Sequence, residues 1–287
     1  MTVHHRTVKV DGHELFYREA GPADAPVLLL LHGFPASSHM FRDLIPKLED
    51  RYHLIAPDHL GFGYSPMPSA DSFEYSFAAL AALTTAFTEQ LGLAQYAVYV
   101  QDYGAPIAWR MALEHPERIT AVITQNGNAY EDGYVEAMWA DVIAYDANPT
   151  PDTANAAAGM QTEELVKWAY QHGVKDQTLL SPDAWQHDLS LLARAGAEQV
   201  QLDLVRTYLD NFKLYPKFQE YFRTSQVPLL AAWGANDEIF PAAGAKAFQR
   251  DLPDAEIHLL DAGHFALESN AAEIAELIRD FLGRKLT

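Results

Sequence analysis

Short apolar runs separated by longer amphipathic stretches dominate the first half of the chain. Polar and apolar residues alternate on either side of Asp11-Gly12, which predicts a β-hairpin. Continuous apolar runs predict buried strands at 27–31, 53–56, 96–100 and 119–124. Helical stretches lie between them at about 40–48, 73–91 and 105–114. This alternation of strand and helix predicts an α/β fold with a mostly parallel sheet covered on both faces.

The pattern changes after residue 127. Residues 128–225 have helical segments, scattered large apolar side chains and few convincing strands. The strand–helix alternation then resumes, with strands at 228–233 and 256–260 and helices near 242–250 and 271–282. This return favours an insertion over a separate helical domain. We therefore expect an eight-stranded core of residues 1–127 and 226–287, with a helical cap at 128–225 inserted after the sixth strand.

Composition narrows the classes of function. The 287 residues are 49% hydrophobic, include no cysteine and carry a formal net charge of −19. The lack of cysteine excludes disulfides and thiolate metal sites, and the negative charge disfavours nucleic acid and anionic membranes as partners. No apolar run approaches the length of a signal peptide or a membrane span. We expect a soluble, cytoplasmic protein that acts on a small-molecule substrate. We expect no metal or cofactor, and the sequence leaves the oligomeric state open.

Asp102 stands where a buried strand runs directly into a helix. The small residues Gly104 and Ala105 follow it, so that the helix and the strand can approach closely. This is typical of a nucleophile elbow, a strained turn that projects one side chain above the sheet. Most hydrolases with this turn have serine at this position, whereas this chain has an aspartate. A simple helix-capping role for Asp102 is the alternative.

The loop His32-Gly33-Phe34-Pro35 follows the third predicted strand. Such a loop supplies a backbone N–H to an oxyanion hole, here that of Phe34, and the N–H of Tyr103 is the expected second donor. We expect the His32 imidazole only to pack and to hold the loop.

An acid and a histidine follow the last two predicted strands. Asp237 comes just after the strand at 228–233, and His264 follows the strand at 256–260. The chain order of nucleophile, acid and histidine is that of a hydrolase triad, and the carboxyl ends of parallel strands meet at one edge of the sheet. We therefore predict that Asp102, Asp237 and His264 are catalytic.

These motifs together resemble the aspartate-nucleophile branch of the α/β-hydrolase superfamily, which includes epoxide hydrolases and haloalkane dehalogenases. The loop at 32–35 is similar to the H-G-F-P of epoxide hydrolases. The elbow at 100–104 is similar to the V-Q-D-W-G of dehalogenases and the H-D-W-G of epoxide hydrolases. The likeness covers residues 10–128 and 226–285 and is weak in the expected cap. It implies the α/β-hydrolase fold.

The departures from these families bear on the substrate. Dehalogenases hold the halide with a tryptophan after the nucleophile and a polar residue after the His-Gly pair, where this chain has Tyr103 and Phe34. Fluoroacetate dehalogenases have an arginine where Tyr103 stands. Epoxide hydrolases use two cap tyrosines as acids, and the candidates here are Tyr145 and Tyr208.

A carboxylate nucleophile suits attack on a saturated carbon, because it is ionised at neutral pH without help. The product is an alkyl ester on Asp102, which water activated by His264 then hydrolyses. We expect an epoxide hydrolase-like enzyme for a small, largely apolar substrate. The alternatives are a carbon–halogen hydrolase and, from another class, a non-hydrolytic small-molecule receptor or a cofactor-free oxygenase on the same scaffold.

Overall fold

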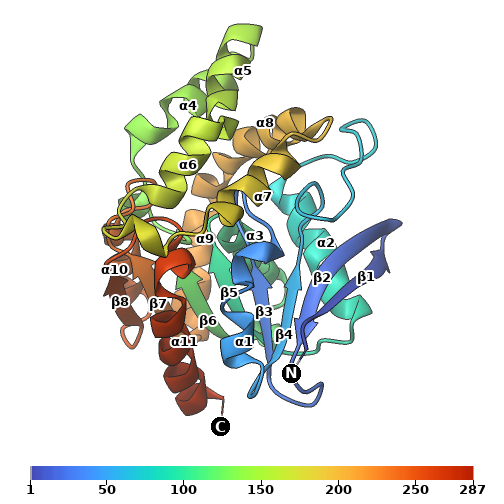
Figure 1. Ribbon diagram of the computed structural model, residues 1–287. Helices are drawn as coiled ribbons and strands as arrows, with labels where there is room; N and C mark the ends of the chain where they lie inside the picture. Colours follow the sequence, from blue (N-terminus) through green and yellow to red (C-terminus); the bar gives the residue numbers. More distant parts are fainter. Residues whose placement is uncertain (1, 287) are drawn as a thin grey trace.

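The computed structural model describes residues 2–286, and its strands form one eight-stranded sheet (Figure 1). The spatial order of the strands is β1-β2-β4-β3-β5-β6-β7-β8. β1 and β2 form a hairpin, and β2 pairs with β4 antiparallel. The remaining pairs, from β4-β3 through to β7-β8, are parallel. The strands are β1 (His4–Val10), β2 (His13–Ala20), β3 (Val27–Leu31), β4 (His53–Pro57), β5 (Tyr96–Gln101), β6 (Ile119–Gln125), β7 (Leu229–Gly234) and β8 (Glu256–Leu260). All lie where the apolar patterning predicted strands, and the α/β-hydrolase fold is confirmed.

Helices cover both faces of the sheet, which explains why the central strands have no polar face. In β3, Leu29 and Leu31 join one core cluster, whereas Leu28 and Leu30 join another, as the two-residue period of a strand requires. The first cluster includes side chains of α2 (Phe77–Gln90), α3 (Gly104–Glu114), α9 (Asp210–Ser225) and α10 (Ala242–Ala247). The second includes side chains of α1 (Ile45–Leu48) and α11 (Ala266–Lys285). Short 3₁₀ turns are η2 (Pro116–Arg118) and η7 (Phe248–Arg250).

Several predicted helices have different limits in the structure; α11, for example, begins at Ala266 rather than near residue 271. The stretch at 40–48 is two short pieces, η1 (Ser38–Phe41) and α1, because Pro46 in the first turn of α1 has no N–H with which to continue a longer helix. The helix predicted from residue 73 begins at Phe77, where the Ser76 side chain accepts the N–H of Ala79 as an N-cap.

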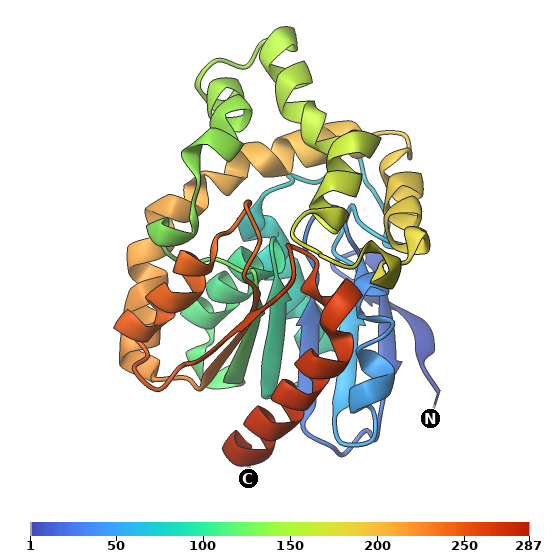
Figure 2. The ribbon, with the colours of Figure 1, turned by 60° about the vertical axis from the view of Figure 1, so that its left-hand side comes forward.

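The chain between β6 and β7 is helical throughout its regular elements. Figures 1 and 2 show α4 to α8 above the carboxyl ends of the strands, while α9 descends beside α3 along the sheet. We call α4 to α8 the upper helices. The elements before α9 are η3 (Glu131–Gly133), η4 (Glu136–Trp139), α4 (Ala140–Ala147), α5 (Pro151–Ala158), η5 (Gly159–Gln161), α6 (Glu163–Gln171), η6 (Gln177–Leu179), α7 (Pro182–Leu192) and α8 (Ala197–Tyr208).

Within residues 2–286, none of the helices is both long enough and apolar enough to cross a lipid bilayer.

Candidate active site

Asp102 occupies a strained turn between β5 and α3. Its φ angle is 48°, in the left-handed region that residues other than glycine rarely adopt. The strand ends at Gln101 and the helix begins at Gly104, so only two residues make the turn. Such strain persists where packing enforces it and is frequent at functional sites. The turn presents a buried carboxylate, 6% exposed, above the end of the sheet.

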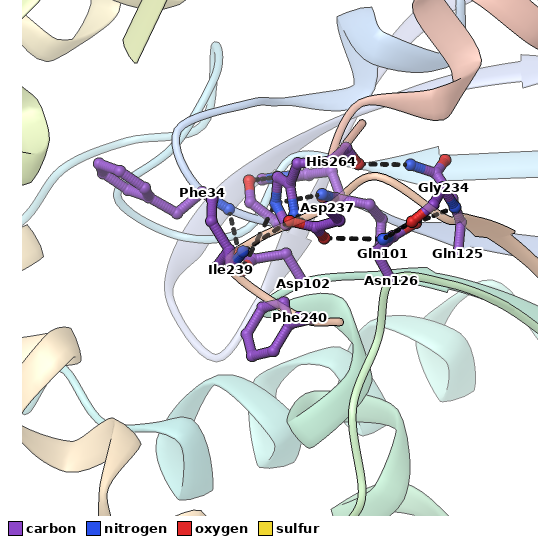
Figure 3. A network of polar contacts seen from close by, with 12 residues as sticks. Phe34, Gln101, Asp102, Gln125, Asn126, Gly234, Asp237, Ile239, Phe240 and His264 are labelled. Carbon is purple, nitrogen blue, oxygen red and sulfur yellow. Dashed lines mark hydrogen bonds and ion pairs between the residues drawn. The ribbon is translucent and has the colours of Figure 1, made fainter. Parts of the chain in front are cut away.

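The His-Gly loop approaches this carboxylate closely. A Cβ on Gly33 would lie 2.3 Å from the Cβ of Asp102, so only glycine fits there. The backbone N–H of Phe34 donates to Asp102 Oδ1 at 2.7 Å (Figure 3). Burial raises the pKa of Asp102, while His264 and the N–H groups of Phe34 and Tyr103 oppose this rise. The two donors expected for an oxyanion hole therefore both act on the same carboxylate.

His264 lies between the two predicted acidic partners. Its Nδ1 is 2.8 Å from Asp237 Oδ2, and its Nε2 is 3.9 Å from Asp102 Oδ2 (Figure 3). Burial alone would lower the pKa of His264, but the charges of Asp237 and Asp102 outweigh it, so the pKa is raised. The structure thus brings all three residues together, with a buried imidazole next to two buried carboxylates.

Asn126, which the sequence reasoning missed, supports the acid. It follows β6 with a φ of 50°, and its amide Nδ2 donates to Asp237 Oδ2 at 2.7 Å. The backbone N–H of Ile239 donates to the other oxygen, Oδ1, at 2.8 Å. Both carboxylate oxygens are therefore held in place. The only local signal was the polar run Thr124-Gln125-Asn126 at the end of a buried strand.

Two buried glutamines, also missed, hold the histidine. Gln101 Nε2 lies 2.8 Å from the Nε2 of His264. Gln125 Nε2 donates to the backbone carbonyl of His264 at 2.9 Å, and its Oε1 accepts the hydroxyl of Tyr99. Each glutamine ends a strand, so a polar residue in the last position of an apolar run was the available signal.

The His32 imidazole lies away from the reacting groups. Its Nε2 accepts the backbone N–H of His59 at 3.1 Å, and its Nδ1 lies 3.0 Å from the carbonyl of Gly33. Burial lowers the pKa of His32 to about 4, so the ring is neutral at pH 7. These contacts hold the loop, as the sequence analysis expected.

A cavity of about 150 Å³ lies over Asp102 and His264. Apolar side chains from the upper helices and from the loops at the strand ends form nearly all of its wall, and no lysine or arginine contributes to it. Members of this wall include Phe34, Trp139, Val142, Met160, Val166, Trp168, Val205 and Ile239. A ligand in this cavity meets an apolar surface with one carboxylate and one imidazole.

The two candidate cap tyrosines do not line this cavity. Tyr145 packs in a separate cluster with Ala157 and Leu202, so the expectation that it lies opposite Asp102 is wrong. The helix α4, which carries Tyr145, packs against α5 and α8. Tyr208 lies closer, since the charge of Asp102 contributes, after burial, to the raised pKa of Tyr208. Its hydroxyl, however, is hydrogen-bonded to Tyr215.

Two residues of the cavity wall have buried donors without a partner among residues 2–286. These atoms are the hydroxyl of Tyr103 and the indole Nε1 of Trp139. Burial, with a smaller contribution from the charge of Asp102, raises the pKa of Tyr103 well above its usual value, which keeps the phenol protonated. A buried donor without a partner has a free-energy cost of about 1–3 kcal/mol. Both atoms are themselves buried, although their residues contribute to the cavity wall.

Sequence comparison gives relatives over nearly the whole chain. The model of the α/β hydrolase fold family matches residues 26–271. An uncharacterised hydrolase of Saccharomyces cerevisiae is 41% identical over 277 residues, which cover 96% of this chain and 95% of that protein. Haloalkane dehalogenase 2 of Mycobacterium tuberculosis is 29% identical and covers 90% of this chain and 88% of its own length.

Solved structures of two kinds of enzyme share this fold. A haloalkane dehalogenase from Bradyrhizobium elkani superposes with a TM-score of 0.82 at 23% identity, over 99% of this chain and 98% of its own. An epoxide hydrolase from Vigna radiata gives a TM-score of 0.78 at 25% identity, over 98% of both chains.

Proposed function

The chain belongs to the α/β hydrolase fold family, and from this premise we propose that it is a hydrolase whose nucleophile is the carboxylate of Asp102. The observation that carries the proposal is the position of this carboxylate in the strained elbow, with its Oδ1 on the N–H of Phe34 and its Oδ2 3.9 Å from His264 Nε2. A helix cap would not require this turn or the facing imidazole.

In the first step, a carboxylate oxygen of Asp102 attacks a saturated carbon of the substrate. A C–O bond forms, the bond from that carbon to its leaving atom breaks, and the product is an alkyl ester of Asp102. The apolar cavity favours this step, because an incompletely solvated carboxylate is a stronger nucleophile than one in water.

In the second step, water hydrolyses the ester. His264 Nε2 takes a proton from the water, whose oxygen attacks Cγ of Asp102. The N–H groups of Phe34 and Tyr103, which both act on the Asp102 carboxylate in the free enzyme, stabilise the oxyanion. The bond from Cγ to the alkyl oxygen then breaks, and the leaving oxygen takes the proton from His264. The water oxygen stays on Asp102, and Asp237 stabilises the transient imidazolium.

An epoxide is the substrate that this wall fits best. Opening the ring produces an alkoxide that needs a proton, and Tyr103, a residue of the cavity wall, has a protonated phenol without a partner among the described residues. The proton left on the Asp102 carboxyl after ester hydrolysis returns to the phenolate, so the cycle balances as epoxide plus water to diol. The lack of a cationic side chain in the wall favours an uncharged substrate, since a buried carboxylate would have no partner.

A carbon–halogen hydrolase is the second candidate. The unpartnered Nε1 of Trp139 supports it, because an indole N–H can solvate a departing halide without transferring a proton. The similarity to haloalkane dehalogenase 2 over 90% of the chain supports it as well. Two features weigh against it: Tyr103 and Phe34 stand at the positions where dehalogenases have their halide-binding residues.

Incubation with 1,2-epoxyhexane and with 1-bromobutane separates the two candidates. We expect diol from the epoxide and little bromide from the haloalkane. In the His264→Gln variant, mass spectrometry should find an alkyl adduct on the peptide that contains Asp102. In single-turnover experiments in H₂¹⁸O, the label should enter Asp102 and not the first diol.

The Asp102→Asn variant is the control and should form no adduct. Label that enters the diol directly in the first turnover would overturn covalent catalysis. No reaction with either substrate in any variant would favour a non-hydrolytic receptor or a cofactor-free oxygenase.

A further inference from the structure

The side-chain amide of Gln101 contacts Nε2 of His264, the nitrogen that takes a proton from water in the proposed ester hydrolysis. Asp237 accepts only, so it fixes the proton of the neutral imidazole on Nδ1, 2.8 Å away. The other nitrogen, Nε2, then carries a lone pair, and Gln101 Nε2 lies 2.8 Å from it. In this tautomer the amide N–H of Gln101 donates to the base itself.

The rest of the Gln101 side chain is confined. Gln101 is fully buried, and its Oε1 has no hydrogen-bond partner among the described residues. A Cβ on Gly33 would lie 2.6 Å from this Oε1, so the same loop that approaches Asp102 also limits the amide. A buried carbonyl oxygen without a partner is costly, and in native proteins such a group usually has a functional reason.

We propose that Gln101 is a positioning residue for the water step: its amide N–H holds the His264 imidazole with the lone pair on Nε2, the nitrogen that faces Asp102. This inference rests on the proposed function and deepens it, because it adds to Asp237 a second residue, beside the nucleophile, that supports this tautomer of the base. Water that enters after alkylation displaces the amide N–H from Nε2. Rotation of the amide would then present Oε1 to the Nε2–H of the imidazolium, so one side chain serves both protonation states.

The electrostatic surroundings of His264 give this contact a measurable effect. The charged groups that face the ring are Asp237, from the loop after β7, and Asp102, from the elbow after β5. Phe240 and Phe265 flank the ring and carry no charge. Both carboxylates favour the imidazolium, whereas a donor on the Nε2 lone pair favours the neutral ring. Gln101 therefore keeps the base deprotonated against the two charges.

The first test uses the substrate-free protein and ¹⁵N-histidine NMR, with the His264 signals assigned by their loss in His264→Gln. The Gln101→Met variant keeps the length of the side chain. In it we expect the midpoint of the His264 titration to move to higher pH and the population of the Nε2–H tautomer to increase. Gln101→Glu should move the midpoint further in the same direction, because it adds a third carboxylate. An unchanged midpoint and tautomer in both variants would overturn the proposal.

The second test separates the two chemical steps by rapid-quench mass spectrometry with 1,2-epoxyhexane. In Gln101→Met, alkylation of Asp102 should keep its rate, while hydrolysis of the ester slows on the order of tenfold, so that the alkyl-enzyme accumulates. Equal slowing of both steps, or no slowing, would contradict the assignment, because a merely structural role does not select one step.

The matched control is Gln201→Met. Gln201 is equally buried in α8 and also has an unpartnered Oε1, but it does not contribute to the cavity wall. We expect it to leave both steps unchanged. If no substrate alkylates Asp102 in the parent protein, the proposed function fails, and the NMR titration still decides whether Gln101 controls His264.

Discussion

Trp139 and Tyr208 stack with their ring centroids 4.4 Å apart and their planes 19° from parallel, and only Trp139 contributes to the cavity wall. The tyrosine at the end of α8 therefore lies behind an indole, with its hydroxyl bonded to Tyr215. We expect Tyr208→Phe to keep most of the alkylation rate, within about threefold, since a neutral hydrogen bond contributes only about 1 kcal/mol. Single-turnover kinetics would measure this, and loss of alkylation would instead make Tyr208 the acid.

Tyr103→Phe is the corresponding change in the cavity wall. It removes a hydroxyl without a partner and keeps the ring, which contacts Phe77 and Tyr208. We expect ring opening of 1,2-epoxyhexane to slow by a factor of about 10²–10⁴, the usual contribution of a general acid, with normal stability in a thermal melt. A rate equal to that of the parent protein would exclude Tyr103 as the proton donor.

The pH dependence of ester hydrolysis follows from His264. The step needs the neutral imidazole, so its rate falls as pH falls through the pKa of the folded protein, which is raised above 6.5. Asp237→Asn removes the larger of the two charges that raise this pKa. The acidic limb of the pH–rate profile should then move to lower pH. The maximal rate should also drop, because the imidazole of His264 loses its orientation. Single-turnover hydrolysis as a function of pH measures both effects, and a limb that moves to higher pH would contradict the assignment.

Asp102→Asn should stabilise the fold while it abolishes alkylation. Burial raises the pKa of Asp102 in the folded protein, so its contribution to stability is present below the unfolded value and is lost as pH rises through the folded pKa. Asparagine has no charge to bury and tolerates the φ of 48°. We expect the free energy of unfolding at pH 7 to rise by about 1 kcal/mol. Urea denaturation checks this, and at pH 3 the gain should shrink.

Gly263→Ala should disturb the loop that carries His264. A Cβ there would lie 1.8 Å from the backbone carbonyl of His172, so one of two backbone segments must move. We expect a loss of about 1–3 kcal/mol in the free energy of unfolding together with lower activity. The control is Gly283→Ala, in α11, where no atom lies within 4 Å of the new Cβ. Helix propensity predicts a small gain of about 0.5–1 kcal/mol there.

The fold and the meeting of Asp102, Asp237 and His264 were predictable from local patterns. Buried parallel strands are continuous apolar runs. Asp102 follows such a run directly, and Asp237 and His264 lie in the loops that follow two others. Because parallel strands present their carboxyl ends at one edge, residues far apart in the chain had to come together. The small residues Gly104 and Ala105 were equally informative, since a close approach of helix and strand requires little side-chain volume.

The direction of side chains in the upper helices could not be predicted in the same way. Tyr145 and Tyr208 both lie on helices with amphipathic patterns, yet one packs between α4, α5 and α8 and the other stacks behind Trp139. A helical period tells which residues share a face but not which neighbour that face meets. That choice depends on how several helices pack together, which no local pattern records.

Local patterns in the chain were enough to predict the order of strands and helices, the elbow at Asp102 and the chain order of the acid and the histidine, because these features follow from periodicity and from turn chemistry within a few residues. The contact of Gln101 with His264, the contact of Asn126 with Asp237 and the place of Trp139 in the cavity wall became known only from the folded chain. Hydrogen bonds and packing between distant segments depend on how those segments are placed in three dimensions, so the sequence around a buried polar or aromatic residue does not identify its partner.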